Sequence, residues 1–207
     1  MICFSNLENI SLHSRIEFNS QTDAMYYFSK CNFQGNSGKE SLCIDINDMT
    51  ADTTHCNLLL EECYFYDNHN PDYAGGACCV SNGFSTTVVA CHFNNSDKTK
   101  SCGGINITAR GVLSVSHSEF IRCDAGSLAD SYGGGIGYSS QMEPKKNREE
   151  RVTIKFCKFD DNTGNNGVAL LLKPETLNVD VSDINVINHY HTSFIFCIFF
   201  FKEADGE

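Results

Sequence analysis

The sequence predicts an all-β protein folded as a parallel β-helix, a solenoid of about five to six coils. One observation is a Cys-x-Phe motif, once Ser-x-Phe, that recurs at intervals of 32, 28, 27, 39 and 40 residues. A period of this size is typical of solenoids, in which each unit buries its apolar face against its neighbours. The others are a strand-like apolar pair before each motif and a glycine-rich segment after most of them.

The Cys-x-Phe motif marks one short strand in each coil. The residue between Cys and Phe is mostly polar, so Cys and Phe are expected to face the core while the middle residue faces water. Strands of neighbouring coils lie about 4.8 Å apart, which would stack these side chains into columns. The copies are Cys31 with Phe33, Cys63 with Phe65, Cys91 with Phe93, Ser118 with Phe120, Cys157 with Phe159, and Cys197 with Phe199.

A second strand precedes the motif. Mostly apolar residues stand five and three positions before each Cys or Ser, and a spacing of two is strand alternation. The step from the second apolar residue to the Cys is three, so a bend or bulge is expected between the two strands. The pairs are Tyr26 and Phe28, Leu58 and Leu60, Thr86 and Val88, Leu113 and Val115, Val152 and Ile154, and Thr192 and Phe194.

A turn and a third strand follow the motif. Asn36, Asn68 and Asn162 each stand three residues after Phe, where Asn tolerates left-handed backbone and bonds to nearby main chain. Stacked Asn side chains can also bond to one another from coil to coil. The glycines that come next permit positive φ and close approach between coils. The third strands are expected at Leu42–Ile46, Ala77–Val80, Ile105–Thr108, Ile136–Tyr138 and Val168–Leu172.

The repeats predict one domain over residues 1–207, with clear repeats over about 26–172. Two looped-out insertions, at about 141–151 and 174–191, would lengthen individual coils. Neither end shows the polar capping unit that solenoids need for solubility, so further coils of a longer chain are expected at one or both ends.

The alternation of Phe-x-x-Asn with Gly-Gly-(Ile/Ala) from Cys31 to about Leu172 resembles the polymorphic outer membrane protein repeat. This repeat is known from chlamydial surface proteins and from surface proteins of some parasitic protists. The resemblance implies a right-handed β-helix that is displayed on a cell surface and used for adhesion. The expected partner is then a host or cell-surface protein or a glycan.

Composition, charge and cysteine pattern limit the classes of partner and site that the sequence supports. A net charge of −11 argues against binding nucleic acid or anionic membrane surfaces. No signal peptide and no apolar run long enough to span a bilayer is found in the sequence. The recurrent cysteines are expected to be free and buried, and no Cys-x-x-Cys supports a zinc site. For the other cysteines, disulfide pairing stays open; they are Cys3, Cys43, Cys56, Cys78, Cys79, Cys102 and Cys123.

The sequence favours a non-enzymatic scaffold or adhesive surface without a catalytic site, metal or cofactor. A carbohydrate-active enzyme (polysaccharide lyase or hydrolase) is the alternative, but Asp67 and Asp161 would lie three coils, about 14 Å, apart. Glycoside cleavage needs carboxyl groups about 5–9.5 Å apart. A truncated fragment without independent activity is a third reading. The sequons at Asn9, Asn94 and Asn106 are candidate glycosylation sites if the chain is secreted.

Overall fold

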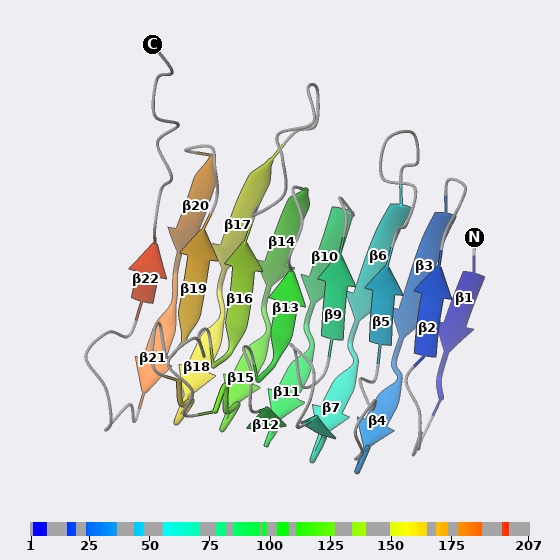
Figure 1. Ribbon diagram of the computed structural model, residues 1–207, viewed down its shortest axis with the longest axis horizontal. Coiled ribbons are helices and arrows are strands. Elements are labelled where there is room, and N and C mark those ends of the chain that lie inside the picture. The colour runs from blue at the N-terminus through cyan, green and yellow to red at the C-terminus, as the bar shows by residue number, and fades with distance from the viewer. Residues whose placement is uncertain are drawn as a thin grey trace.

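The protein is a right-handed parallel β-helix, which confirms the predicted fold class. The computed structural model describes residues 2–7, 16–19, 24–36, 44–47, 56–70, 78–81, 85–95, 97–98, 103–107, 111–126, 134–139, 150–164, 169–173, 178–187 and 196–198. All pairings between the described strands are parallel. In Figure 1 the chain descends in the rear sheet and ascends in the front sheet while it advances from N to C, which makes the winding right-handed.

Three long sheets enclose the core. Sheet A contains β1 (Ile2–Ser5), β3 (Ala24–Ser29), β6 (Cys56–Glu61), β10 (Ser85–Val89), β14 (Val112–Ser116), β17 (Arg151–Lys155) and β20 (Val179–Ser182). Sheet B contains β4 (Asn32–Gln34), β7 (Tyr64–Tyr66), β11 (His92–Asn94), β15 (Glu119–Ile121), β18 (Lys158–Asp160) and β21 (Asn185–Ile187). Sheet C contains β2 (Ile16–Asn19), β5 (Ile44–Asn47), β9 (Cys78–Ser81), β13 (Ile105–Ile107), β16 (Ile136–Ser139), β19 (Leu170–Lys173) and β22 (Phe196–Ile198).

Among the described residues, sheets A and C each contain seven strands and sheet B contains six. The number of coils therefore differs slightly from the predicted five to six. A small additional sheet pairs β8 (His69–Asn70) with β12 (Asp97–Lys98). From β3 onward, the chain runs in each coil through sheet A, then sheet B, then sheet C (Figure 1).

A left-handed residue forms the bend between sheets A and B. It lies directly before the Cys or Ser of the motif in five coils and before Ile184 in the sixth, and it accounts for the change of parity there. Its φ lies between 51° and 54° in six successive coils, at Lys30, Glu62, Ala90, His117, Phe156 and Asp183. Because L-residues other than glycine disfavour this conformation by about 1–2 kcal/mol, the coil geometry must impose it at these positions.

The corner after sheet B also uses a left-handed residue, but not the Asn that the sequence suggested. Positive φ falls on the residue before the Asn, as at Gly35, Asp67 and Asp161. The Asn side chain turns inward instead. Asn36 Nδ2 donates to Asn68 Oδ1 at 2.8 Å, and Asn68 Nδ2 donates to the Phe33 carbonyl at 3.1 Å. The expected coil-to-coil bonding of Asn side chains is therefore present.

Phenylalanine rings stack in a continuous column inside sheet B. The five rings Phe33, Phe65, Phe93, Phe120 and Phe159 are fully buried. Successive ring centroids lie 4.7–5.1 Å apart, and the interplanar angles are 7° or less. The one-to-one register of the sheet B strands places the rings above one another.

The glycines before sheet C make room for this column. A Cβ on Gly135 would lie 2.8 Å from the Phe159 ring, and one on Gly104 would lie 3.0 Å from the Phe120 ring and 2.4 Å from the Gly135 carbonyl oxygen. Close approach is thus the reason for glycine here. The expected positive φ is not found at these two glycines.

The last predicted repeat was assigned to the wrong residues. Cys197 lies in β22 of sheet C opposite Leu171. Val186 pairs with Phe159 in sheet B. The sixth copy is therefore Ile184-Asn185-Val186, preceded by Val179 and Val181 at the expected spacing, and these four apolar residues pack against the core. Residues 178–187 form a regular part of the coil and not an insertion.

The predicted insertion at 141–151 extends too far at its end. Arg151 begins β17, and Glu150 is buried, with its carboxylate accepting a hydrogen bond of 3.1 Å from the Tyr138 hydroxyl. The same hydroxyl lies 3.0 Å from the Gly111 carbonyl oxygen and accepts a hydrogen bond of 3.3 Å from the Gly111 N–H. These bonds link the end of β16 to the start of the sheet A strands, so Glu150 belongs to the corner of the coil.

Candidate binding surface

The outward side chains of sheet B form a straight row along the solenoid. They occupy the middle position of the motif, between the inward Cys or Ser and the inward Phe. Strand pairing keeps them in register, so neighbours in the row lie one coil apart. The members of this outer row are Asn32, Tyr64, His92, Glu119, Lys158 and Asn185.

Two rings stack within the outer row. The centroids of Tyr64 and His92 lie 4.6 Å apart with an interplanar angle of 6°. His92 Nδ1 lies 3.1 Å from Glu119 Oε2 on the next coil, so the imidazole is held from both sides. Tyr64 keeps 51% of its surface exposed. An aromatic side chain so exposed and yet fixed in orientation is suited to contact a ligand.

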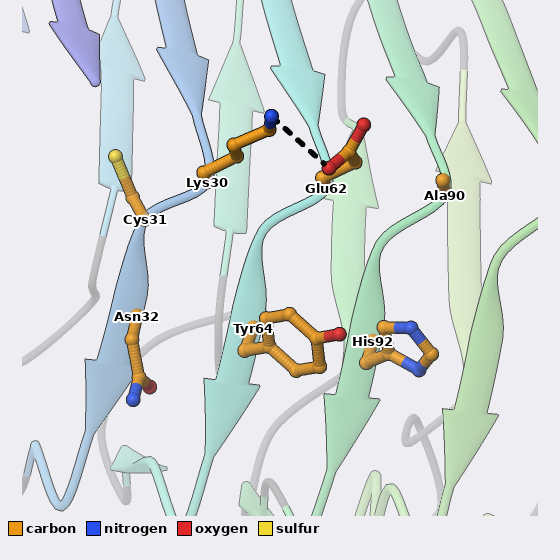
Figure 2. Close-up of a pocket in the computed structure, with 7 residues that line it drawn as sticks. All are labelled: Lys30, Cys31, Asn32, Glu62, Tyr64, Ala90 and His92. Carbon is orange, nitrogen blue, oxygen red and sulfur yellow. Dashed lines mark ion pairs between the residues drawn. The ribbon is translucent and has the colours of Figure 1, made fainter. Parts of the chain in front are cut away.

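A shallow hollow of about 450 Å³ lies beside this ring pair and is called here the sheet B hollow. Figure 2 shows Lys30 and Glu62 at the bend, above the rings of Tyr64 and His92, with Asn32 on the preceding strand. Lys30 Nζ and Glu62 Oε2 form an ion pair at 3.7 Å. The lining residues are Lys30, Cys31, Asn32, Glu62, Tyr64, Ala90 and His92.

The bend between sheets A and B shapes the hollow. Lys30, Glu62 and Ala90 are the left-handed residues of three successive coils, and this corner conformation places their side chains beside the outer row. The small Ala90 lies next to two long side chains along this corner. One cation and one anion line the hollow and pair with each other, so its lining is locally near neutral in a chain with net charge −11.

The motif cysteines lie in a column along the inside of the bend, and one of them, Cys31, also lines the hollow. Cys31, Cys63, Cys91 and Cys157 are buried free thiols, and Cys123 is buried at the corner after sheet B. Burial raises the pKa of the Cys31 thiol, and raises that of Cys157 to about 11. A hydrogen bond to Cys63, together with burial, raises the pKa of Cys91. Nucleophilic and metal-binding cysteines need the thiolate, which burial disfavours at Cys31, Cys91 and Cys157. At Cys63 the hydrogen bond with the Cys91 side chain acts the other way and lowers the pKa.

The thiols nevertheless form hydrogen bonds. The sequence analysis treated the motif cysteines as small hydrophobic residues and did not include these bonds. Cys63 Sγ lies 3.4 Å from the carbonyl oxygens of both Phe28 and Glu61, which share its single proton. Cys91 Sγ accepts from the Cys63 N–H at 3.4 Å. The column therefore satisfies backbone groups at the bend, where the sheet ladder is interrupted.

The three sequons differ in accessibility. Asn106 is only 1% exposed within β13, so its side chain is not accessible to a glycan in the folded coil. Asn94 is half-buried in β11, and its Oδ1 accepts a hydrogen bond of 3.0 Å from Arg122. Asn9 lies outside the described residues. Asn94 remains the one described sequon with an accessible side chain.

The acidic turn residues do not form a catalytic pair in the described part of the chain. Asp67 and Asp161 both occupy the left-handed corner after sheet B, on coils separated by two others. Asp67 accepts a hydrogen bond from Asn95, as expected of a turn residue. Within the described ranges, no group of three or more His, Cys, Asp or Glu side chains is arranged to hold a metal ion. The same residues contain no helix with the length and apolarity needed to cross a bilayer.

The sequence reading treated the middle position of the motif only as polar and so missed the hollow. A signal was present, since Tyr64 and His92 are rings at the same position of consecutive copies and must stack if the coils are in register.

Comparison with protein-family models, curated proteins and solved structures gives no match to this chain.

Proposed function

We propose that the protein is a non-enzymatic scaffold that binds its partner on the outer face of sheet B. The observation that carries this proposal is the exposed Tyr64–His92 ring pair beside the Lys30–Glu62 ion pair. Parallel pairing in register fixes these side chains on a rigid sheet, so little conformational entropy is lost when a partner binds.

The wider setting of the proposal comes from the resemblance to the polymorphic outer membrane protein repeat. It implies display on a cell surface and adhesion to a host or cell-surface protein or glycan. The acidic net charge is compatible with such partners and unfavourable for nucleic acid. An exposed aromatic side chain is a common energetic centre of adhesive interfaces.

Retention on defined probes tests the binding face. The purified chain is passed over immobilised matrix proteins, mucin, and neutral and acidic polysaccharides. The proposal expects retention on at least one probe. It also expects the Tyr64→Ala/His92→Ala double variant to lose that retention. Met25→Ala, which alters an exposed residue of sheet A, serves as the matched control and should bind like the parent.

The same preparation is assayed for cleavage of acidic polysaccharides with and without calcium. The proposal expects no products. Robust cleavage would replace the scaffold by a carbohydrate-active enzyme. Retention that persists in the double variant, or no retention on any probe, would remove sheet B as the binding face.

A further inference from the structure

The sheet B hollow has the composition of a site for one ring of a ligand. Its volume of about 450 Å³ lies within the range of small-molecule sites, about 300–1,000 Å³. Such sites combine an apolar wall with a few polar groups that fix orientation. Here the Tyr64 ring supplies the wall, and Lys30, Glu62 and Asn32 supply the polar groups.

The Tyr64 ring offers one face to a ligand. His92 covers the face that is turned toward the following coil, at 4.6 Å. The row position on the preceding coil is Asn32, whose side chain is shorter than a ring. A flat group over Asn32 would continue the stack at the coil spacing, as His92 does on the other side. This geometry selects a ring with an apolar face.

The polar groups select a neutral ligand rich in hydroxyl groups. Lys30 and Glu62 form an ion pair at 3.7 Å. Because their charges compensate each other, the hollow does not favour a ligand of either charge. Their side chains are more than half exposed, with relative exposures of 58% and 54%, so they can exchange water for a ligand. Hydroxyl groups can accept from the Lys30 ammonium and donate to the Glu62 carboxylate at once. An anionic ring would meet Glu62 and a chain of net charge −11.

We infer that the sheet B hollow binds a neutral sugar ring of a glycan, stacked on Tyr64 and hydrogen-bonded to Lys30, Glu62 and Asn32. The C–H face of a pyranose carries slight positive charge and suits the negative face of an aromatic ring. This inference rests on the proposed function and names the ligand class for the same face. A single ring in an open hollow gives a Kd on the order of 1 mM.

The test uses cellotriose, chitotriose and N-acetyllactosamine as neutral probes, with sialyllactose and a heparin tetrasaccharide as anionic probes. Saturation-transfer NMR with the full chain measures binding. At least one neutral probe is expected to bind with a Kd near 1 mM, and the anionic probes at least tenfold more weakly. Tyr64→Ala is expected to weaken the neutral probe about tenfold, whereas Tyr64→Phe keeps the ring and should bind within about twofold of the parent.

Tyr66→Ala is the matched control, because Tyr66 is exposed on the same strand but does not line the hollow. It should bind like the parent. The inference fails if no neutral probe binds, if anionic probes bind as well, or if Tyr64→Ala and Tyr66→Ala weaken binding equally. If a matrix protein is retained through sheet B but no neutral glycan binds, this inference is refuted and the proposed function stays in place. No retention on any probe would refute both.

Discussion

Removal of Phe93 tests whether the stacked column holds the coils together. Phe93 is fully buried, and parallel rings lie at 4.7 Å on one face and 4.8 Å on the other. Buried Phe→Ala substitutions cost about 3–5 kcal/mol, and the cost rises where the cavity cannot collapse. Backbone pairing fixes the two flanking rings at the coil spacing, so they cannot close the gap. We therefore expect Phe93→Ala to lower the free energy of unfolding by about 4–5 kcal/mol.

Urea unfolding followed by far-UV circular dichroism measures this change. A typical domain has about 5–15 kcal/mol of stability, so the midpoint should fall markedly, and the loss should uncouple the coils on either side. Phe156→Ala is the matched control, because this ring is 53% exposed and its loss should change stability by about 0.5 kcal/mol or less. A loss below about 1 kcal/mol for Phe93→Ala, or equal losses for both variants, would refute the column as the main source of core stability.

Other substitutions test the corners of the coil. Gly135→Ala should cost about 1–3 kcal/mol in urea unfolding, because its Cβ would lie 2.8 Å from the Phe159 ring; an unchanged midpoint would contradict this. Asn68→Ala should cost about 2–3 kcal/mol in the same assay, since it removes a buried donor and acceptor; a neutral effect would exclude a structural role for the Asn row. Burial raises the pKa of Cys157 to about 11, whereas the ordinary pKa of a Cys thiol is about 8.5. The unfolded state therefore loses this proton first, and the free energy of unfolding should fall as pH rises from about 8.5 to 11. Urea titrations of the parent and Cys157→Ser across this range check it, and iodoacetamide at pH 8 should label exposed Cys3 well before Cys157.

The sequence contains most of the information that positions the core. Each Phe of the motif is expected to face inward, because the neighbouring residues are mostly polar and side chains alternate along a strand. The position of the sheet C strands follows in the same way, within about two residues, from short apolar runs after the glycines. These features are local and need no knowledge of distances between coils.

The parts that were missed depend on relations between coils. The final copy, Ile184-Asn185-Val186, carries neither Cys nor Phe, so only its apolar spacing marks it, and that spacing was read as an insertion. The left-handed backbone at Lys30 and Phe156 has no local propensity behind it and is imposed by the coil. The Lys30–Glu62 ion pair likewise depends on the interval between two repeats, which places these two bend residues on neighbouring coils. Such contacts become predictable only once the register of every coil is known.

Ser118 shows why the first position of the motif is Cys or Ser and not simply apolar. Its hydroxyl donates to the Ser116 carbonyl at 2.9 Å and accepts from the Cys91 N–H at 3.1 Å. The thiol of Cys91 serves the preceding coil in the same way, since it donates to the Val89 carbonyl and accepts from the Cys63 N–H. The column therefore satisfies the backbone at each bend, through groups small enough to lie inside the coil.

A pair of substitutions at Ser118 separates this role from simple volume. Ser118→Ala keeps the size but leaves the Cys91 N–H without its acceptor, so a loss of about 1–3 kcal/mol in urea unfolding is expected. Ser118→Cys restores a donor and an acceptor in the form used by the other coils, and its loss should be smaller than that of the alanine variant. Amide hydrogen exchange at Cys91 should accelerate in Ser118→Ala and stay slow in Ser118→Cys. If alanine were as stable as serine, with unchanged exchange at Cys91, packing volume alone would explain the column, and the hydrogen bonds at the bend would be incidental.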